Sequence, residues 1–514
     1  MTDSPVVSLG VASPSRDDVL AVARHRARVE IAPEALVAMR ESRDRVEELA
    51  QSGRPVYGIS TGFGALATKY IEPGRRRQLQ SALVRSHAAG SGALVETEVV
   101  RAMMFLRLST MCTAHTGVRP ETALAYAAML NADVTPCVYE YGSLGCSGDL
   151  APLAHCALAL TGEGMTRDRS GVVLPAAEAL AAAGVEPVVL QEKEGLALIN
   201  GTDGMLGMLV LGIADLESLA KAADISAAMS IEALLGTDRV HAADLQSLRP
   251  HPGQACSARN IVRMLAGSSL VASHRSGDAR VQDAYSLRCA PQVAGAMRDT
   301  LAHARTVSER EMASAIDNPV VLADGRIESN GNFHGAPVGY VLDFLAIAAA
   351  DLASMSERRT DRLLDPARSA GLPPFLAYDP GVDSGYMIAQ YTQAAVVSEL
   401  KRLAAPASVD SIPSSAMQED HVSMGWNAAR KLRRAVDGLS RVLAIEMLVA
   451  ARALDLRAPL KPGQGTRAAL GVLRSRIEST GPDRELSAEI GAAFEMVSRG
   501  EVQTAVEGEI EPLE

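Results

Sequence analysis

A helical period that persists over long stretches is the feature that most constrains the fold of this chain. Apolar side chains recur at steps of three and four residues in three stretches of its second half. The three runs are Leu209, Ile213, Leu216 and Ala220; Val338, Val341, Leu345, Leu352 and Met355; and Leu432, Val436, Leu439 and Leu443. This spacing places each run on one face of a helix, and helices of this length favour an elongated bundle in which they pack side by side.

Residue composition indicates the same class. Aromatic residues make up only 3% of the chain, whereas Ala and Leu dominate it, and sheets prefer aromatic and β-branched side chains. Loop-like clusters gather in the first two hundred residues. We therefore expect an all-α fold, in which an irregular, loop-rich N-terminal domain (residues 1–205) precedes a long central helical bundle with C-terminal helices (residues 206–514).

Charge and apolar patterning argue against several classes of partner. The formal net charge is -11 and no extended basic tract is present, so we expect no nucleic-acid partner. The first ten residues lack the basic and apolar regions of a secretory signal, and the apolar stretch at 205–214 is too short to span a membrane. The cysteines lack metal-ligand spacing and are expected to be reduced in the cytoplasm, with no metal bound. They are Cys112, Cys137, Cys146, Cys156, Cys256 and Cys289.

Seven polar or glycine-rich clusters interrupt the helical pattern, and each alone is a weak signal. The most informative reads GSLGCSGDLAPLAH and places three glycines around Ser147. The clusters are YGISTGFG (57–64), RSHAAGSG (85–92), GSLGCSGDLAPLAH (142–155), LINGTDG (198–204), VQDAYSLR (281–288), SNGNFHG (329–335) and SIPSSAMQEDHVSMG (411–425).

Two familiar explanations of the Ser147 cluster fail. Gly145 and Gly148 miss the G-x-S-x-G spacing of a serine nucleophile elbow, and the strand–turn–helix context is absent. No lysine follows the glycines as in a phosphate-binding loop. Cys146 as a thiol nucleophile remains open.

Ring closure explains the glycines better. In a compressed loop the amide nitrogen of Gly148 reaches the carbonyl carbon of Cys146 and closes a five-membered ring, a conformation in which a Cβ at position 148 would clash. Loss of water from the ring and from the Ser147 side chain leaves a methylene conjugated to a carbonyl, a methylidene-imidazolone. Only the first residue keeps its side chain, so cysteine is permitted there.

The seven clusters, in this order, resemble those of the aromatic amino acid ammonia-lyase family, which builds such a group from an (Ala/Cys)-Ser-Gly-Asp motif. The similarity extends over nearly the whole chain. It implies that 4-methylidene-imidazol-5-one forms from Cys146, Ser147 and Gly148, with no external cofactor. Three positions depart from the usual family pattern: Cys146 replaces an alanine, Asp203 replaces a glutamine, and Leu400 in ELK (399–401) stands where asparagine is commoner.

The resemblance also implies roles for residues in the other clusters. Tyr57 would be a catalytic base or proton relay, with Tyr285 in the same hydrogen-bond system. Arg288 would hold the substrate carboxylate in its planar fork, and Asn200 would donate to the ring oxygen. The lining of the pocket would include Gln282 and Phe333.

Ser86-His87, together with Glu419 in QEDH, resembles the members of the family that act on histidine. His87 and the catalytic Glu419 can satisfy the donor and the acceptor of an imidazole ring, whereas a phenyl ring would suit an apolar pocket. The resemblance implies conversion of L-histidine to trans-urocanate and ammonia, the first step of histidine degradation. It leaves open whether the amine or the ring of the substrate attacks the methylene. It further implies a homotetramer whose active sites combine motifs from more than one chain.

Three other functions are weighed against this one. A tyrosine or phenylalanine lyase, or an aminomutase, would share the chemistry but conflicts with His87 and Glu419. A catalytically dead helical homologue conflicts with the intact Ser147, Tyr57 and the other catalytic positions. A cysteine hydrolase would lose its activity on Cys146→Ala, whereas a lyase would keep it.

Overall fold

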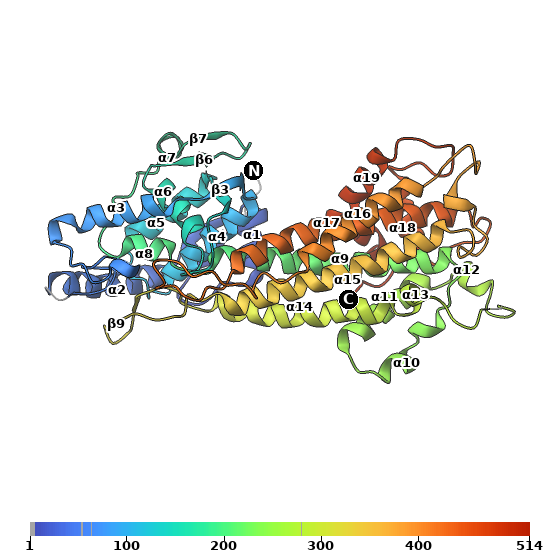
Figure 1. The fold of residues 1–514 in the computed structure, drawn as a ribbon, viewed down its shortest axis with the longest axis horizontal. Helices are drawn as coiled ribbons and strands as arrows, with labels where there is room; N and C mark the ends of the chain where they lie inside the picture. Colours follow the sequence, from blue (N-terminus) through green and yellow to red (C-terminus); the bar gives the residue numbers. More distant parts are fainter. Residues whose placement is uncertain (1–5, 53–54, 63, 279) are drawn as a thin grey trace. The chain divides into compact units, whose positions relative to one another are not determined.

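The computed structural model describes residues 6–52, 55–62, 64–278 and 280–514. Helices predominate and the strands are few and short (Figure 1). The all-α prediction is therefore confirmed. Phe63, in the first of the seven clusters, lies outside the described residues.

The chain divides into two compact units, each built from segments far apart in sequence. Unit 1 comprises residues 1–211, 305–342 and 406–430, and unit 2 comprises residues 212–304, 343–405 and 431–514. The chain passes between the units five times, once in the loop at residues 405–406 and four times within long helices. These helices are α9 (Asp203–Ala233), α14 (Ala290–Met312), α15 (Ala336–Leu364) and α17 (Gly425–Asp455). The division into domains at residue 205 stays a prediction.

Unit 1 is organised around a helix that is buried on every side. All residues of α4 from Val99 to Cys112 are buried, including Arg101 and Arg107. Proline at the first turn starts α2 and α5, where its missing N–H costs no hydrogen bond. The helices of this unit are α1 (Arg16–Arg24), α2 (Pro33–Gln51), α3 (Arg76–His87), α4 (Thr97–Cys112), α5 (Pro120–Asn131), α6 (Leu150–Leu160), α7 (Ala176–Ala183) and α8 (Glu194–Ile199).

The strands of unit 1 form small separate sheets. The pair β1 (Val6–Leu9) and β2 (Arg28–Ile31) is parallel, with Val7 opposite Val29. The other pairings are antiparallel: β3 (Ser91–Leu94) with β5 (Tyr139–Tyr141), β6 (Met165–Arg167) with both β4 (Thr135–Pro136) and β7 (Val173–Pro175), and β8 (Val320–Val321) with β9 (Ile327–Glu328).

Unit 2 is a helical bundle in which buried polar groups of α17 form hydrogen bonds to three neighbouring helices. Glu446 on this helix accepts hydrogen bonds from Ser230 on α9 and from Arg359 on α15. The Val442 carbonyl accepts from Gln393 on α16. The remaining helices of unit 2 are α10 (Ala243–Ser247), α11 (Pro252–Leu265), α12 (Ser269–Ala272), α13 (Tyr285–Arg288), α16 (Met387–Leu403), α18 (Gln464–Arg474), α19 (Leu486–Ser498) and α20 (Glu501–Glu507). Short 3-10 turns occupy Gly64–Leu66 and Pro73–Arg75 in unit 1, and Arg239–His241 and Pro374–Leu376 in unit 2.

The apolar runs of the sequence fall on α9, α15 and α17, and nearly all of their side chains are buried. Among the described residues, α15 is the one helix long and apolar enough to cross a membrane by length and composition. Of its most apolar window, 61% is buried inside the protein, as in the core helix of a globular fold.

Candidate active site

The Ser147 loop takes a conformation that only glycine permits at two positions. Gly145 and Gly148 have φ angles of +75° and +72°, in the left-handed region. A Cβ on Gly148 would overlap the carbonyl of Gly201, and one on Gly145 would overlap the hydroxyl of Ser423. The loop is thus pressed against two other segments, which holds the residues around Ser147 in a tight turn.

Asp149 joins this loop to the start of α9 by hydrogen bonds. Its backbone N–H donates to the Gly201 carbonyl at 2.7 Å, and its carboxylate accepts from the Met205 N–H at 2.8 Å and from the Ser143 hydroxyl at 3.0 Å. Burial raises the pKa of this carboxyl to about 7. The three bonds join the Ser147 loop and the 200–205 segment into one rigid piece.

Asn200 faces Ser147 across this junction. The Ser147 hydroxyl donates to Asn200 Oδ1 at 3.0 Å, while Asn200 Nδ2 donates to the Asn318 carbonyl at 2.8 Å. With the serine hydroxyl in place, Asn200 is therefore an acceptor at this point. Its expected donation to the ring oxygen concerns the cyclised loop and stays a prediction.

Cys146 points toward the 411–425 segment. Its Sγ lies 3.4 Å from the Ser414 hydroxyl, which donates to Glu419 Oε2 at 2.8 Å. Burial raises the pKa of the Cys146 thiol, and the nearby Glu419 carboxylate raises it further. The raised pKa favours the protonated thiol, which is a poor nucleophile and argues against a cysteine hydrolase.

Tyr57 and His87 lie within electrostatic range of the same carboxylate. Burial raises the pKa of Tyr57 and lowers that of His87, and Glu419 raises both. His87, at the end of α3, bonds the Leu83 carbonyl through Nδ1 at 2.9 Å. Since a carbonyl only accepts, Nδ1 carries the proton and Nε2 is left as an acceptor. Unit 1 thus brings Tyr57, His87 and Cys146 together around Glu419.

The predicted residues of the 281–288 cluster lie in unit 2. The Tyr285 side chain is 70% exposed, and the Arg288 guanidinium stands 4.5 Å from the centre of its ring. Arg288 Nε is buried and makes no hydrogen bond. Gln282 is exposed on the preceding loop. Tyr285 and Arg288 thus contact each other within unit 2, and the place of these three residues in the active site stays a prediction.

Phe333 is half-buried in the loop between β9 and α15, and its place in the pocket stays a prediction. Sequence reasoning missed two buried charges beside Asn200. Lys193 Nζ donates to Asp317 Oδ2 at 2.5 Å, and both side chains are fully buried. The Asn-Pro pair after Asp317 was a turn signal, but nothing in the sequence pairs it with Lys193, 124 residues away.

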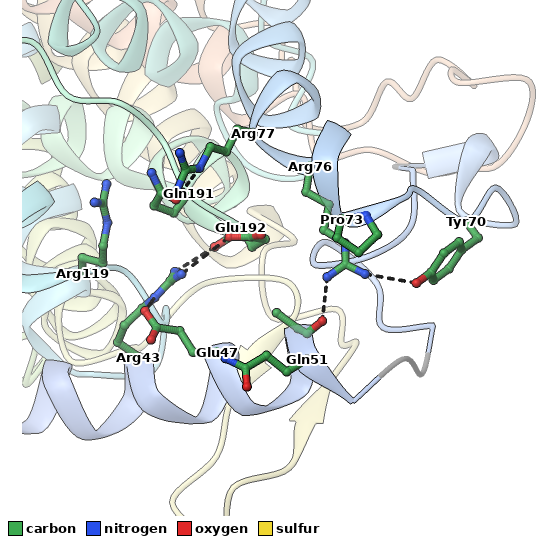
Figure 2. A pocket seen from close by; sticks show the side chains of 11 residues that line it. Arg43, Glu47, Gln51, Tyr70, Pro73, Arg76, Arg77, Arg119, Gln191 and Glu192 are labelled. Carbon is green, nitrogen blue, oxygen red and sulfur yellow. Dashed lines mark hydrogen bonds and ion pairs between the residues drawn. The ribbon is translucent and has the colours of Figure 1, made fainter.

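A cavity of about 690 Å³ lies elsewhere in unit 1, and it contains none of the predicted site residues (Figure 2). Its four arginines already have partners: Arg43 bonds Glu47, Arg76 bonds backbone carbonyls and Tyr70, Arg77 bonds Gln191, and Arg119 bonds Glu194. Among the residues that the structure describes, no cluster of three or more His, Cys, Asp or Glu side chains is arranged to hold a metal ion.

Comparison with known proteins decides the family. The family model described as aromatic amino acid lyase matches residues 15–475. The chain belongs to the aromatic amino acid lyase family. A protein named histidine ammonia-lyase from Streptomyces avermitilis is 63% identical to it over 99% of both chains.

Two solved structures of the family share the fold. The tyrosine aminomutase of Streptomyces globisporus superimposes with a TM-score of 0.93 at 37% identity, covering 99% of this chain and 100% of that one. The histidine ammonia-lyase of Trypanosoma cruzi does so with a TM-score of 0.90 at 37% identity, covering 98% and 96%. The lyases and an aminomutase therefore have one architecture, so the fold alone does not select the substrate.

Proposed function

We propose that this chain catalyses the non-oxidative deamination of L-histidine to trans-urocanate and ammonia. The observation that carries the proposal is the loop at 146–148, where a serine hydroxyl faces Asn200 and only glycine fits at the next position. Relatives of 63% identity named histidine ammonia-lyase support the choice of substrate.

The prosthetic group would be formed by Cys146, Ser147 and Gly148, and these residues fit it. The left-handed φ of Gly148 and its contact with Gly201 suit a compressed loop, and the Cys146 side chain is accommodated beside Ser414. When formed, the group supplies an electrophilic methylene conjugated to a carbonyl.

Substrate recognition is assigned to His87 and Glu419. Both side chains present acceptors, His87 through Nε2 and Glu419 through its carboxylate. Either can accept the single N–H of a neutral imidazole ring, and both together suit the two N–H groups of an imidazolium. Arg288 would hold the substrate carboxylate, since its half-buried guanidinium has a donor without a partner.

Proton transfer is assigned to Tyr57. Burial and the charge of Glu419 raise its pKa, so the phenol keeps its proton near neutral pH. A phenol that keeps its proton is suited to act as a relay, which receives one proton and passes another on. It is less suited to act as a base that must begin ionised. Tyr285 would join the same relay.

We further propose a homotetramer whose active sites combine unit 1 of one chain with unit 2 of another. The exposure of Tyr285 beside Arg288 supports a partner at that surface. In unit 2, a groove of about 540 Å³ between α14 and α15 exposes apolar side chains, among them Phe344 and Ile347, each 45% exposed. Apolar grooves of this kind are typical of interfaces.

We place the protein in the cytoplasm, with no nucleic acid or membrane as partner. The six cysteines are all free in the structure, as expected in a reducing compartment. The negative net charge supports the absence of nucleic acid.

Intact mass tests the proposal directly. We expect the wild-type chain to be lighter than its sequence by two water molecules, about 36 Da, and to produce urocanate from L-histidine. Ser147→Ala should keep the full mass and the fold, with almost no activity. An active wild-type chain of full mass would exclude the prosthetic group.

The aminomutase alternative rests on the fold shared with the Streptomyces globisporus structure. Cinnamate, coumarate or β-amino acids formed from phenylalanine or tyrosine faster than urocanate from histidine would favour it.

A further inference from the structure

Lys193 and Asp317 form a fully buried ion pair that has no part in the roles proposed above. Lys193 Nζ lies 2.5 Å from Asp317 Oδ2, and both side chains are 0% exposed. Burial lowers the pKa of Lys193, against the attraction of Asp317. Replacing a buried ion pair by neutral residues is often harmless to stability, so stability alone is a weak reason for its presence.

The second carboxylate oxygen of Asp317 connects this pair to Asn200. Asp317 Oδ1 accepts from the Asn318 N–H at 2.7 Å and lies 3.5 Å from Asn200 Nδ2. The Asn318 carbonyl is the other acceptor for Nδ2, at 2.8 Å. Asp317 therefore supplies one acceptor for the Asn200 amide. It also bonds the N–H of Asn318, the residue whose carbonyl supplies the other acceptor.

These contacts determine which end of the Asn200 amide faces Ser147. A carboxylate only accepts hydrogen bonds, so Nδ2 is favoured on the side of Asp317 and Oδ1 is left for the Ser147 hydroxyl. An amide at position 317 could also donate, which would remove one of the two contacts that fix this orientation and leave the Asn318 carbonyl alone to hold Nδ2.

We propose that Lys193 and Asp317 are positioning residues, which hold Asn200 with its amide oxygen on the Ser147 hydroxyl and thereby promote formation of the prosthetic group. This inference rests on the proposed function. In ring closure, Gly148 N bonds the Cys146 carbonyl carbon, whose oxygen leaves as water with the hydrogens of Gly148 N and Ser147 N. The second water takes the Ser147 hydroxyl and its Cα hydrogen.

The test is the double variant Lys193→Met/Asp317→Asn in the full-length chain, because it removes both charges and leaves no unpaired ion. We expect it to fold, by circular dichroism and by elution volume, but to lose the two waters more slowly by about tenfold or more, followed by intact mass after a pulse of expression. The control is Arg101→Met/Asp133→Asn, which neutralises an ion pair of unit 1 that has no hydrogen bond to Asn200 or Ser147. Arg101 is buried, and Asp133, which also pairs with Arg26, is 23% exposed. The control should mature at the wild-type rate.

Asp317→Glu keeps the negative charge and its lysine partner, so we expect it to fold even if the double variant does not. Because the longer side chain displaces the carboxylate from Asn200, this variant should also form the prosthetic group slowly. Maturation at the wild-type rate in either folded variant would overturn the inference. A wild-type chain of full mass would instead contradict the proposed prosthetic group, so the two failures are distinguishable.

Discussion

His87 and Glu419 are the residues on which the choice of substrate depends. Each offers an acceptor to an imidazole N–H, and a phenyl ring would leave that acceptor without its substrate bond, at about 1–3 kcal/mol for each. We expect His87→Leu and Glu419→Gln to lower kcat/KM for L-histidine by about tenfold or more, since 1.4 kcal/mol corresponds to a factor of ten. Turnover of L-phenylalanine, measured in parallel, should stay unchanged or rise.

Tyr57→Phe is the natural comparison for these two variants, because a proton relay serves any substrate. It should reduce the turnover of both amino acids alike. If His87→Leu behaved in the same way, His87 would serve the shared chemistry or the fold, and not the choice of ring.

At the scale of elements, α4 and the start of α9 are joined by a buried charge pair. Arg107 Nε lies 3.3 Å from Asp203 Oδ2, with the side chains 0% and 6% exposed, and Arg107 also donates to the Asn200 and Ile316 carbonyls. Asp203→Asn would leave this guanidinium without its carboxylate at nearly constant volume. We expect a loss of about 3 kcal/mol, measured by urea unfolding.

Asp437→Asn on α17 is the matched control, since Asp437 pairs with Arg441 at an exposed position where both side chains are about half exposed. It should cost less than about 1 kcal/mol. Equal stability of the two variants would mean that the Asn200 and Ile316 carbonyls suffice for Arg107. The departure from the family's usual glutamine at position 203 would then have no structural consequence.

At the scale of the whole molecule, the placement of Ser147 in unit 1 and Arg288 in unit 2 permits a test of shared active sites. Ser147→Ala and Arg288→Lys chains, each weakly active alone, should recover activity when co-expressed and purified through two different tags. If each site draws these residues from different chains, random mixing restores about a quarter of the sites.

Mixing the two purified proteins without subunit exchange serves as the control and should restore nothing. Activity of the co-expressed oligomers no greater than the mean of the two parents would show that one chain supplies both residues.

The sequence by itself determined the helical class, the family and the tripeptide at 146–148. These depend on local properties: apolar side chains at helical spacing, and a serine before a glycine for which the structure then shows no room for a Cβ. Tyr57, His87 and Cys146 all interact electrostatically with Glu419, and their roles in the site stay predictions.

Only the tertiary structure decided what surrounds those residues. The pairing of Lys193 with Asp317 joins positions 124 residues apart, and the orientation of the Asn200 amide follows from acceptors on that distant segment. The structure also placed Tyr285 and Arg288 in a different unit from Ser147. Such contacts are set by packing between segments, and side-chain spacing along the chain carries no information about which buried charges will meet.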